Sequence, residues 1–125
     1  NAVTELKKMG ITTIISITPS DVGRFRSNLY GFNLIEIPFA STTGPSPQVL
    51  DKFLQAVSKQ NEIFYLHAHG ATHRAGIIGM AFRLYVQNWS IDDAINEFER
   101  LGGSVLESGT MIQNVLAYQN NRSAP

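Results

Sequence analysis

The sequence predicts an α/β fold in which a mostly parallel central sheet is flanked by helices. The main observation is that short β-branched apolar segments alternate along the chain with longer segments of helical periodicity. A second observation is that residues favouring turns bound each apolar segment, as expected for short buried strands. A length of 125 residues leaves room for one hydrophobic core, so residues 1–125 are expected to form a single domain.

The first part of the chain predicts one short helix and two strands. Apolar residues near the N-terminus have helical spacing and are followed by Gly10, which is typical of a helix ending at a glycine cap. Residues 11–17 are a β-branched apolar run, which predicts a buried strand. Residues 32–39 predict a second strand, which Pro38 stops.

The middle of the chain predicts a helix, a strand and a second helix. The first helix is expected to begin near Ser46, a residue that can cap its first turn. Residues 63–66 predict a third strand, which leads directly into residues 67–74. Residues 75–86 are apolar almost all round, so they predict a central helix rather than a surface helix. The helix after Ser46 should bury one face, made by Val49, Leu50, Phe53, Leu54 and Val57.

Two more helices are expected toward the C-terminus. Ser90 should cap a helix that closes at residues 101–103, where two glycines follow a leucine. Residues 107–118 predict a last helix. The acidic residues of the helix after Ser90 predict a solvated face, made by Asp92, Asp93, Glu97 and Glu99.

Composition excludes several classes of partner. Ten Lys and Arg residues balance ten Asp and Glu residues, so no global charge draws the protein to nucleic acid or anionic lipid. No apolar run approaches the roughly 20 residues that span a bilayer, so we expect no membrane span and a cytoplasmic location. The chain begins at Asn1 without an initiator methionine and enters a helical pattern at once, so further residues are expected upstream. It contains no cysteine, which excludes disulfides.

Residues 67–74 read His-Ala-His-Gly-Ala-Thr-His-Arg and lie between a predicted buried strand and an apolar helix. Such a turn directs several backbone N–H groups into one concavity, where the helix dipole also favours an anion. Gly70 allows close approach of the backbone, and Arg74 can pair with two oxygens of one phosphate. The segment therefore predicts a phosphate-binding loop.

The order His67, Ala68, five further residues and Arg74 resembles the His-Cys-x5-Arg signature of protein tyrosine and dual-specificity phosphatases, with alanine at the cysteine position. The resemblance runs from Thr4 to about Leu101. It includes the Ile-Pro end of the second strand and the Gly-Pro-Ser-Pro opening of the next helix. Rhodaneses have a shorter loop before the arginine, and low-molecular-weight tyrosine phosphatases carry the loop near the N-terminus, so neither family fits.

The resemblance implies a cysteine-dependent enzyme that transfers a phosphoryl group in two steps and needs no cofactor. A thiolate at position 68 would attack phosphorus, and water would hydrolyse the phosphocysteine. His67 would help to hold the loop, and Arg74 would stabilise charge on the transferring group. Because Ala68 has no nucleophile, the chain should bind phosphate esters without turning them over. The phosphate-binding residues would be His67, His69, Gly70, Ala71, Thr72, His73 and Arg74.

Alanine at position 68 has two explanations. One is an engineered substitution made to trap a bound ligand, which the otherwise intact loop favours. Natural inactive members commonly lose the arginine too, whereas Arg74 is present. The alternative is a natural pseudophosphatase that binds a phosphorylated partner.

A general acid is missing from its usual place. The family resemblance implies an aspartate on the loop after the second strand, where it protonates the leaving oxygen. Here that loop, residues 40–44, has no carboxylate, and Ser41 stands about where the aspartate would fall. Asp21, at the carboxyl end of the first strand, is our candidate for the acid, and Asp51 is a second.

Substrate identity stays open among phosphoproteins, inositol phosphates and other small phosphate esters. A highly phosphorylated ligand would need cations besides Arg74, and Arg24 and Arg26 lie on the same predicted rim. A different reading makes the three histidines, His67, His69 and His73, ligands of a metal ion. We favour the phosphate reading because no histidine follows His73 to complete such a site.

Overall fold

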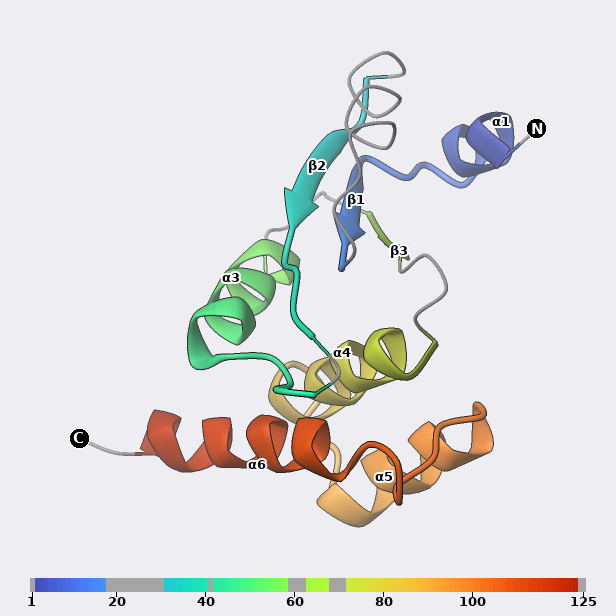
Figure 1. Ribbon diagram of the computed structural model, residues 1–125. Helices are drawn as coiled ribbons and strands as arrows, with labels where there is room; N and C mark the ends of the chain where they lie inside the picture. The colour runs from blue at the N-terminus through green and yellow to red at the C-terminus, as the bar shows by residue number, and fades with distance from the viewer. Residues whose placement is uncertain (1, 18–30, 41, 59–62, 68–71, 124–125) are drawn as a thin grey trace.

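A computed structural model of the chain describes residues 2–17, 31–40, 42–58, 63–67 and 72–123 (Figure 1). Three strands and two helices make up the first part of the described chain, and three helices follow them. The elements are α1 (Ala2–Lys8), β1 (Thr13–Ser16), β2 (Asn33–Glu36), α3 (Pro47–Val57), β3 (Phe64–His67), α4 (Thr72–Tyr85), α5 (Ile91–Arg100) and α6 (Gly109–Ser123).

The three strands form one sheet in the order β2-β1-β3, and both pairings are parallel. Thr13 pairs with Asn33 on one side and with Phe64 on the other. The strands therefore end in register, with Ser16 level with both Glu36 and His67. This confirms the predicted parallel sheet. It also places His67, the last residue of β3, at the carboxyl edge, where open parallel sheets bind ligands.

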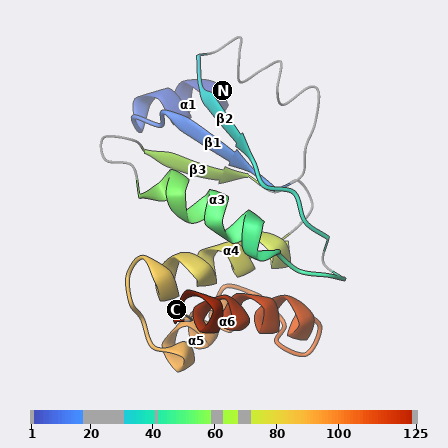
Figure 2. The same cartoon turned by 90° about the vertical axis from the view of Figure 1, so that its left-hand side faces the viewer.

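The hydrophobic core lies between the sheet and the helices α3 to α6 (Figure 2). Ile15, Ile17 and Ile37 enter it from β1 and from the ends of β1 and β2. Ile77 and Ile78 of α4 are completely buried in the same cluster. Helix α4 contacts α3, α5 and α6, which confirms that it is a central helix.

The capping serines were predicted correctly. Ser46 Oγ accepts a hydrogen bond from Val49 N at 3.1 Å at the start of α3, and Pro47 follows as the first helical residue. Ser90 Oγ accepts from Asp93 N at 3.1 Å at the start of α5. Each bond satisfies a backbone donor that the first helical turn leaves unpaired.

Some boundaries differ from prediction. Helix α4 begins at Thr72 rather than Ala75, because its first three residues are polar and extend the turn without extending the apolar pattern. Arg74 is therefore the third residue of the helix. The last helix begins at Gly109, two residues later than expected. Within the described ranges, no helix is both long enough and apolar enough to cross a membrane.

The solvated face predicted for α5 is wrong at Glu97. Its side chain is only 13% exposed, and its Oε1 lies 2.9 Å from Nε of Arg83 on α4. The guanidinium of Arg83 also lies 4.5 Å from the ring centroid of Trp89. Glu97 thus ties α5 to α4 instead of facing solvent.

Candidate anion-binding site

The predicted phosphate-binding loop joins β3 to α4. His67 is the last residue of β3 and Thr72 is the first of α4. The backbone of both is described, whereas the residues between them, Ala68, His69, Gly70 and Ala71, lie outside the described residues, as do Asp21, Arg24 and Arg26. His67 ends β3 at the carboxyl edge of the sheet, level with Ser16 of β1.

The start of α4 has the backbone groups that the predicted anion site requires. The first N–H groups of any α-helix have no acceptor within the helix, and the helix dipole adds partial positive charge there. Helix α4 runs for 14 residues, long enough for a full dipole, and it begins with Thr72, His73 and Arg74. A phosphate at this end would meet backbone donors and a guanidinium together.

Arg74 reaches from α4 to the segment that follows β2. Its Nη1 donates a hydrogen bond to the carbonyl oxygen of Phe39 at 3.1 Å, in partly buried surroundings. The contact uses one of the five N–H groups of the guanidinium and holds its plane on one side. A guanidinium held in this way can present another edge to a phosphate oxygen pair.

Residues 39–45, which we call the 39–45 turn, form the segment where the family resemblance implied a general acid. The carbonyl oxygen of Ala40 accepts hydrogen bonds from Thr43 N at 3.3 Å and from Gly44 N at 2.8 Å. Pro45 is completely buried. Lys52 Nζ donates to the carbonyl oxygen of Glu36 at 2.8 Å and ties α3 to the end of β2. Ser41 lies outside the described residues.

A carboxylate that sequence reasoning missed lies near the first turn of α4. Glu107 Oε2 is 4.0 Å from His73 Nε2, and their side chains are 71% and 38% exposed. The pair attracts only when the histidine is protonated, and solvent screens it. Sequence spacing gave no signal for it, because the residues are brought together by the folding of α5 and α6 onto α4.

The second acid candidate, Asp51, has a structural partner. Its Oδ1 accepts a hydrogen bond from the hydroxyl of Tyr118, which joins α3 to α6. The first candidate, Asp21, lies outside the described residues and stays a prediction. The structure therefore gives the Asp51 carboxylate a packing role.

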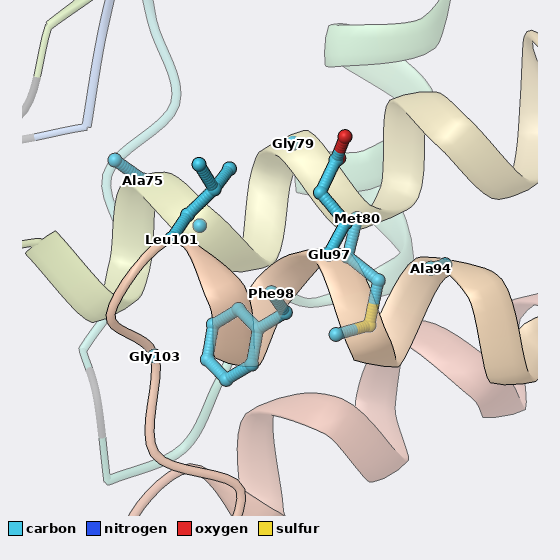
Figure 3. Close-up of a pocket in the computed structure, with 9 residues that line it drawn as sticks. Ala75, Gly79, Met80, Ala94, Glu97, Phe98, Leu101 and Gly103 are labelled. Carbon is cyan, nitrogen blue, oxygen red and sulfur yellow. The ribbon is translucent and has the colours of Figure 1, made fainter.

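A cavity of about 260 Å³ lies between α4 and α5, beside the start of α4 but lined mainly by apolar atoms (Figure 3). Gly76 and Gly79 of α4 line it on one side, and Phe98 of α5 and Leu101, the residue after α5, line it on the other. Its carboxylate, Glu97, is already paired with an arginine. Such a lining offers no donors to a phosphate, so the cavity is separate from the predicted anion site.

The structure describes only part of the candidate metal ligands. In the part of the chain that the structure describes, no three His, Asp or Glu side chains come together as metal ligands. His69 and the side chain of His67 are not in that part. The metal alternative therefore stays a prediction.

Comparison with known proteins finds similarity in structure alone. No protein-family model matches the sequence, and no curated protein does. Among solved structures, Pseudomonas aeruginosa TpbA, in a Cys-to-Ser variant bound to phosphotyrosine, has a TM-score of 0.77 at 16% identity, over 99% of this chain and 80% of that chain. The active form of Tk-PTP has a TM-score of 0.73 at 19% identity, over 96% and 86%.

The kinase-associated phosphatase, with its catalytic-site cysteine changed to serine, has a TM-score of 0.76 at 17% identity, over 98% of this chain and 76% of that chain. All three cover nearly the whole of this chain. The chain has the fold of the small cysteine-dependent phosphatases. This confirms the fold that the His67 to Arg74 pattern implied, although identity below 20% leaves the roles of single residues as proposals.

Proposed function

We propose that the native form of this protein is a cysteine-dependent phosphatase of phosphate monoesters, and that the present chain is its nucleophile-dead form. The observation that carries the proposal is that β3 ends at His67 and α4 begins at Thr72, five residues later, with Arg74 in the first helical turn. In that position a guanidinium and helix N–H groups converge on one anion. The shared fold with cysteine-dependent phosphatases supports it.

The chemistry assigns one role to each part. A thiolate at position 68 attacks phosphorus, the bond from phosphorus to the ester oxygen breaks, and that oxygen leaves as an alcohol or phenol once it is protonated. Water then attacks the phosphocysteine and releases inorganic phosphate and the thiolate. Arg74 and the loop N–H groups stabilise the negative charge on the equatorial oxygens in both steps. In this proposal His67 holds the loop. The phosphate is surrounded by the residues that follow, which are His69, Gly70, Ala71, Thr72 and His73.

In this proposal Ala68 removes the attacking atom, while the other residues of the His-x-x5-Arg pattern are kept. Two of the similar structures, TpbA and the kinase-associated phosphatase, themselves carry a serine for the cysteine. A substitution of this kind blocks the first step and lets a substrate stay bound. We infer that Ala68 is engineered and that the native residue is cysteine.

The proposal is tested by restoring the nucleophile. Ala68→Cys should hydrolyse an aryl phosphate, whose leaving group needs little protonation, and orthovanadate should inhibit it. Ala68→Ser, matched in size and lacking a thiolate, should stay inactive. A correctly folded Ala68→Cys protein without vanadate-sensitive turnover would reject the proposal.

The general acid is proposed to be Asp21, since the 39–45 turn offers no carboxylate. The prediction concerns leaving groups. In the Ala68→Cys background, Asp21→Asn should slow an alkyl phosphate far more than an activated aryl phosphate, because only the alkyl leaving group depends strongly on a proton. Equal slowing of both substrates would show that Asp21 is not the acid.

The substrate is proposed to be a phosphoprotein, an inositol phosphate or another small phosphate ester. TpbA was crystallised with phosphotyrosine, so a phosphotyrosine peptide is the first substrate to assay here. Arg24 and Arg26 are the proposed extra cations for a polyphosphorylated ligand. If they act so, Arg24→Gln with Arg26→Gln should weaken inositol polyphosphate binding and leave phosphotyrosine binding unchanged.

A natural pseudophosphatase is the second candidate, favoured by the lack of a carboxylate in residues 40–44 together with Ala68. Such a protein would bind a phosphorylated partner and never turn it over. It predicts that phosphotyrosine peptide binds to the present chain as tightly as to Ala68→Cys, while Ala68→Cys releases no phosphate.

A further inference from the structure

The 39–45 turn is held between two helices that are far apart in sequence. At its start, the carbonyl oxygen of Phe39 accepts the hydrogen bond from Arg74 Nη1 at 3.1 Å. Near its end, the carbonyl oxygen of Thr43 accepts a hydrogen bond from Nδ2 of Asn114 on α6. The turn thus connects the arginine on α4 with an amide on α6.

Backbone hydrogen bonds link the parts of the turn that lie between these two contacts. The carbonyl oxygen of Ala40 accepts from Thr43 N at 3.3 Å and from Gly44 N at 2.8 Å. Gly44 has φ +74°, and a Cβ built on it would lie 3.0 Å from Met111 Cα on α6. The completely buried Pro45 follows. The end of the turn therefore packs closely against α6.

Helices α4 and α6 also contact each other directly, and Figure 1 shows them as neighbours. The hydroxyl of Tyr85, near the end of α4, donates to the carbonyl oxygen of Val115, the residue after Asn114. The Tyr85 and Tyr118 rings meet edge to face with centroids 5.2 Å apart. Helix α6 is therefore fixed against α4 and at the same time holds the turn that orients the arginine on α4.

Asn114 differs from its neighbours on α6 in what it contacts. The buried residues of the helix, Met111, Ile112, Val115 and Tyr118, belong to the hydrophobic core. Asn114 is only partly buried, and its amide points to the turn. The amide is thus free of a core-packing role, while Gln113 beside it is exposed.

We propose that Asn114 is a positioning residue for Arg74, acting through the 39–45 turn. The proposal rests on the proposed function, because it assigns Arg74 to phosphate binding. The physical reason is that a long arginine side chain loses much rotational freedom when it grips an anion. If Phe39 is held in place, its carbonyl oxygen restricts the Arg74 side chain before the ligand binds. Less conformational entropy is then lost on binding, so the affinity for the anion is higher.

The first experiment uses the chain as it is and inorganic tungstate as the phosphate mimic. Asn114→Asp is isosteric and removes the donor, and Gln113→Glu makes the same chemical change one residue away on the exposed face. Calorimetry should show tungstate binding weakened about five- to tenfold by Asn114→Asp, as for the loss of one hydrogen bond. It should be weakened less than about twofold by Gln113→Glu. Equal effects of the two variants would overturn the proposal.

The second experiment asks whether Asn114 acts through the arginine. In an Arg74→Lys background the ammonium lacks the planar fork that the Phe39 carbonyl orients. Asn114→Asp should then change tungstate affinity less than about twofold, so the two substitutions should be strongly non-additive. A full five- to tenfold effect in the Arg74→Lys background would show a general structural role and overturn the proposal.

A third readout separates positioning from simple damage. In the Ala68→Cys revertant, Asn114→Asp should lower kcat by a larger factor than it raises KM, because Arg74 meets its largest charge in the transition state. A rise in KM with unchanged kcat would contradict the proposal. If Asn114→Asp does not fold, Asn114→Ala takes its place, with Gln113→Ala as the control.

Failure of this proposal and failure of the proposed function are distinguishable. If the original chain binds no tungstate, the anion site is wrong and Asn114 has nothing to position. If the original chain binds tungstate and Ala68→Cys turns over an aryl phosphate, but Asn114→Asp behaves like Gln113→Glu, only the positioning role falls.

Discussion

Two connecting segments contact the first turn of α4, and they are held in different ways. The 39–45 turn receives hydrogen bonds from Arg74 and Asn114. The α5–α6 connection, residues 101–108, touches the same helical turn through a solvent-exposed pair of side chains 4.0 Å apart. In that connection Leu101 and Leu106 are 70% and 94% exposed. One neighbour of the proposed anion site is thus joined to α4 by a partly buried hydrogen bond, while the other meets α4 through an exposed ion pair.

The largest effect is expected from removing the side chain that joins α4 to the 39–45 turn. Arg74→Ala removes both the proposed phosphate contact and the bond to Phe39. Tungstate affinity of the present chain should fall about 10- to 150-fold, as for loss of a charge-assisted hydrogen bond. Calorimetry measures it, and an unchanged affinity would remove Arg74 from the site.

A pair of glycines compares the packing of the two segments directly. Gly44 and Gly102 both have positive φ, +74° and +100°. An added Cβ at Gly44 would lie 3.0 Å from Met111 Cα, whereas at Gly102 it would meet nothing within 4 Å. Gly102→Ala should therefore cost only backbone strain, about 1 kcal/mol. Gly44→Ala should cost about 2–4 kcal/mol, because overlap adds to strain.

Chemical denaturation of both glycine variants gives the two free energies of unfolding. Equal losses of stability would mean that the 39–45 turn shifts to make room for the extra methyl group. Its packing against α6 would then be loose.

Two serines make a smaller comparison. Ser46 Oγ accepts from Val49 N at 3.1 Å and caps α3 directly after the turn, while Ser104 Oγ accepts from Glu107 N at 3.2 Å within the α5–α6 connection. Ser46→Ala should lower the free energy of unfolding by about 1 kcal/mol, as for a helix cap. Ser104→Ala, in an exposed loop, should change it by less than about 0.5 kcal/mol. A thermal unfolding series that ranks them in reverse would contradict the comparison.

The smallest effect should come from the exposed ion pair. Glu107→Gln removes a negative charge near the proposed anion site, so tungstate affinity should rise, but by less than about threefold, because solvent screens the charge. The rise should vanish in 0.5 M salt. A decrease in affinity would show that Glu107 supports the site instead of opposing the anion.

The sequence predicted those features that depend on local residue pattern. Ser46 and Ser90 were identified as caps because a serine oxygen before an apolar period has one common use. The parallel sheet followed from alternation of strands and helices. The start of α4 was predicted three residues late, because Thr72, His73 and Arg74 carry no apolar period.

Contacts between distant segments could not be predicted. Glu97 was taken as solvated because its neighbours on α5 are acidic, and its partner Arg83 is on another helix. The hydrogen bonds from Arg74 and Asn114 end on backbone carbonyl oxygens. Every residue has such an oxygen, so the residue types along the sequence could not indicate the acceptors. The family resemblance located the arginine but could not show which part of this chain would hold it.

The order of elements along the chain has a consequence for biosynthesis. Arg74 is translated forty residues before Asn114. The hydrogen bond from Asn114 to the 39–45 turn therefore cannot form until well after β3 and α4 have been synthesised. A nascent chain at that stage would contain Arg74 and Phe39 but would lack Asn114, the residue that holds the 39–45 turn. If Asn114 positions Arg74 as proposed, tight phosphate binding should therefore develop only after α6 has packed against the 39–45 turn.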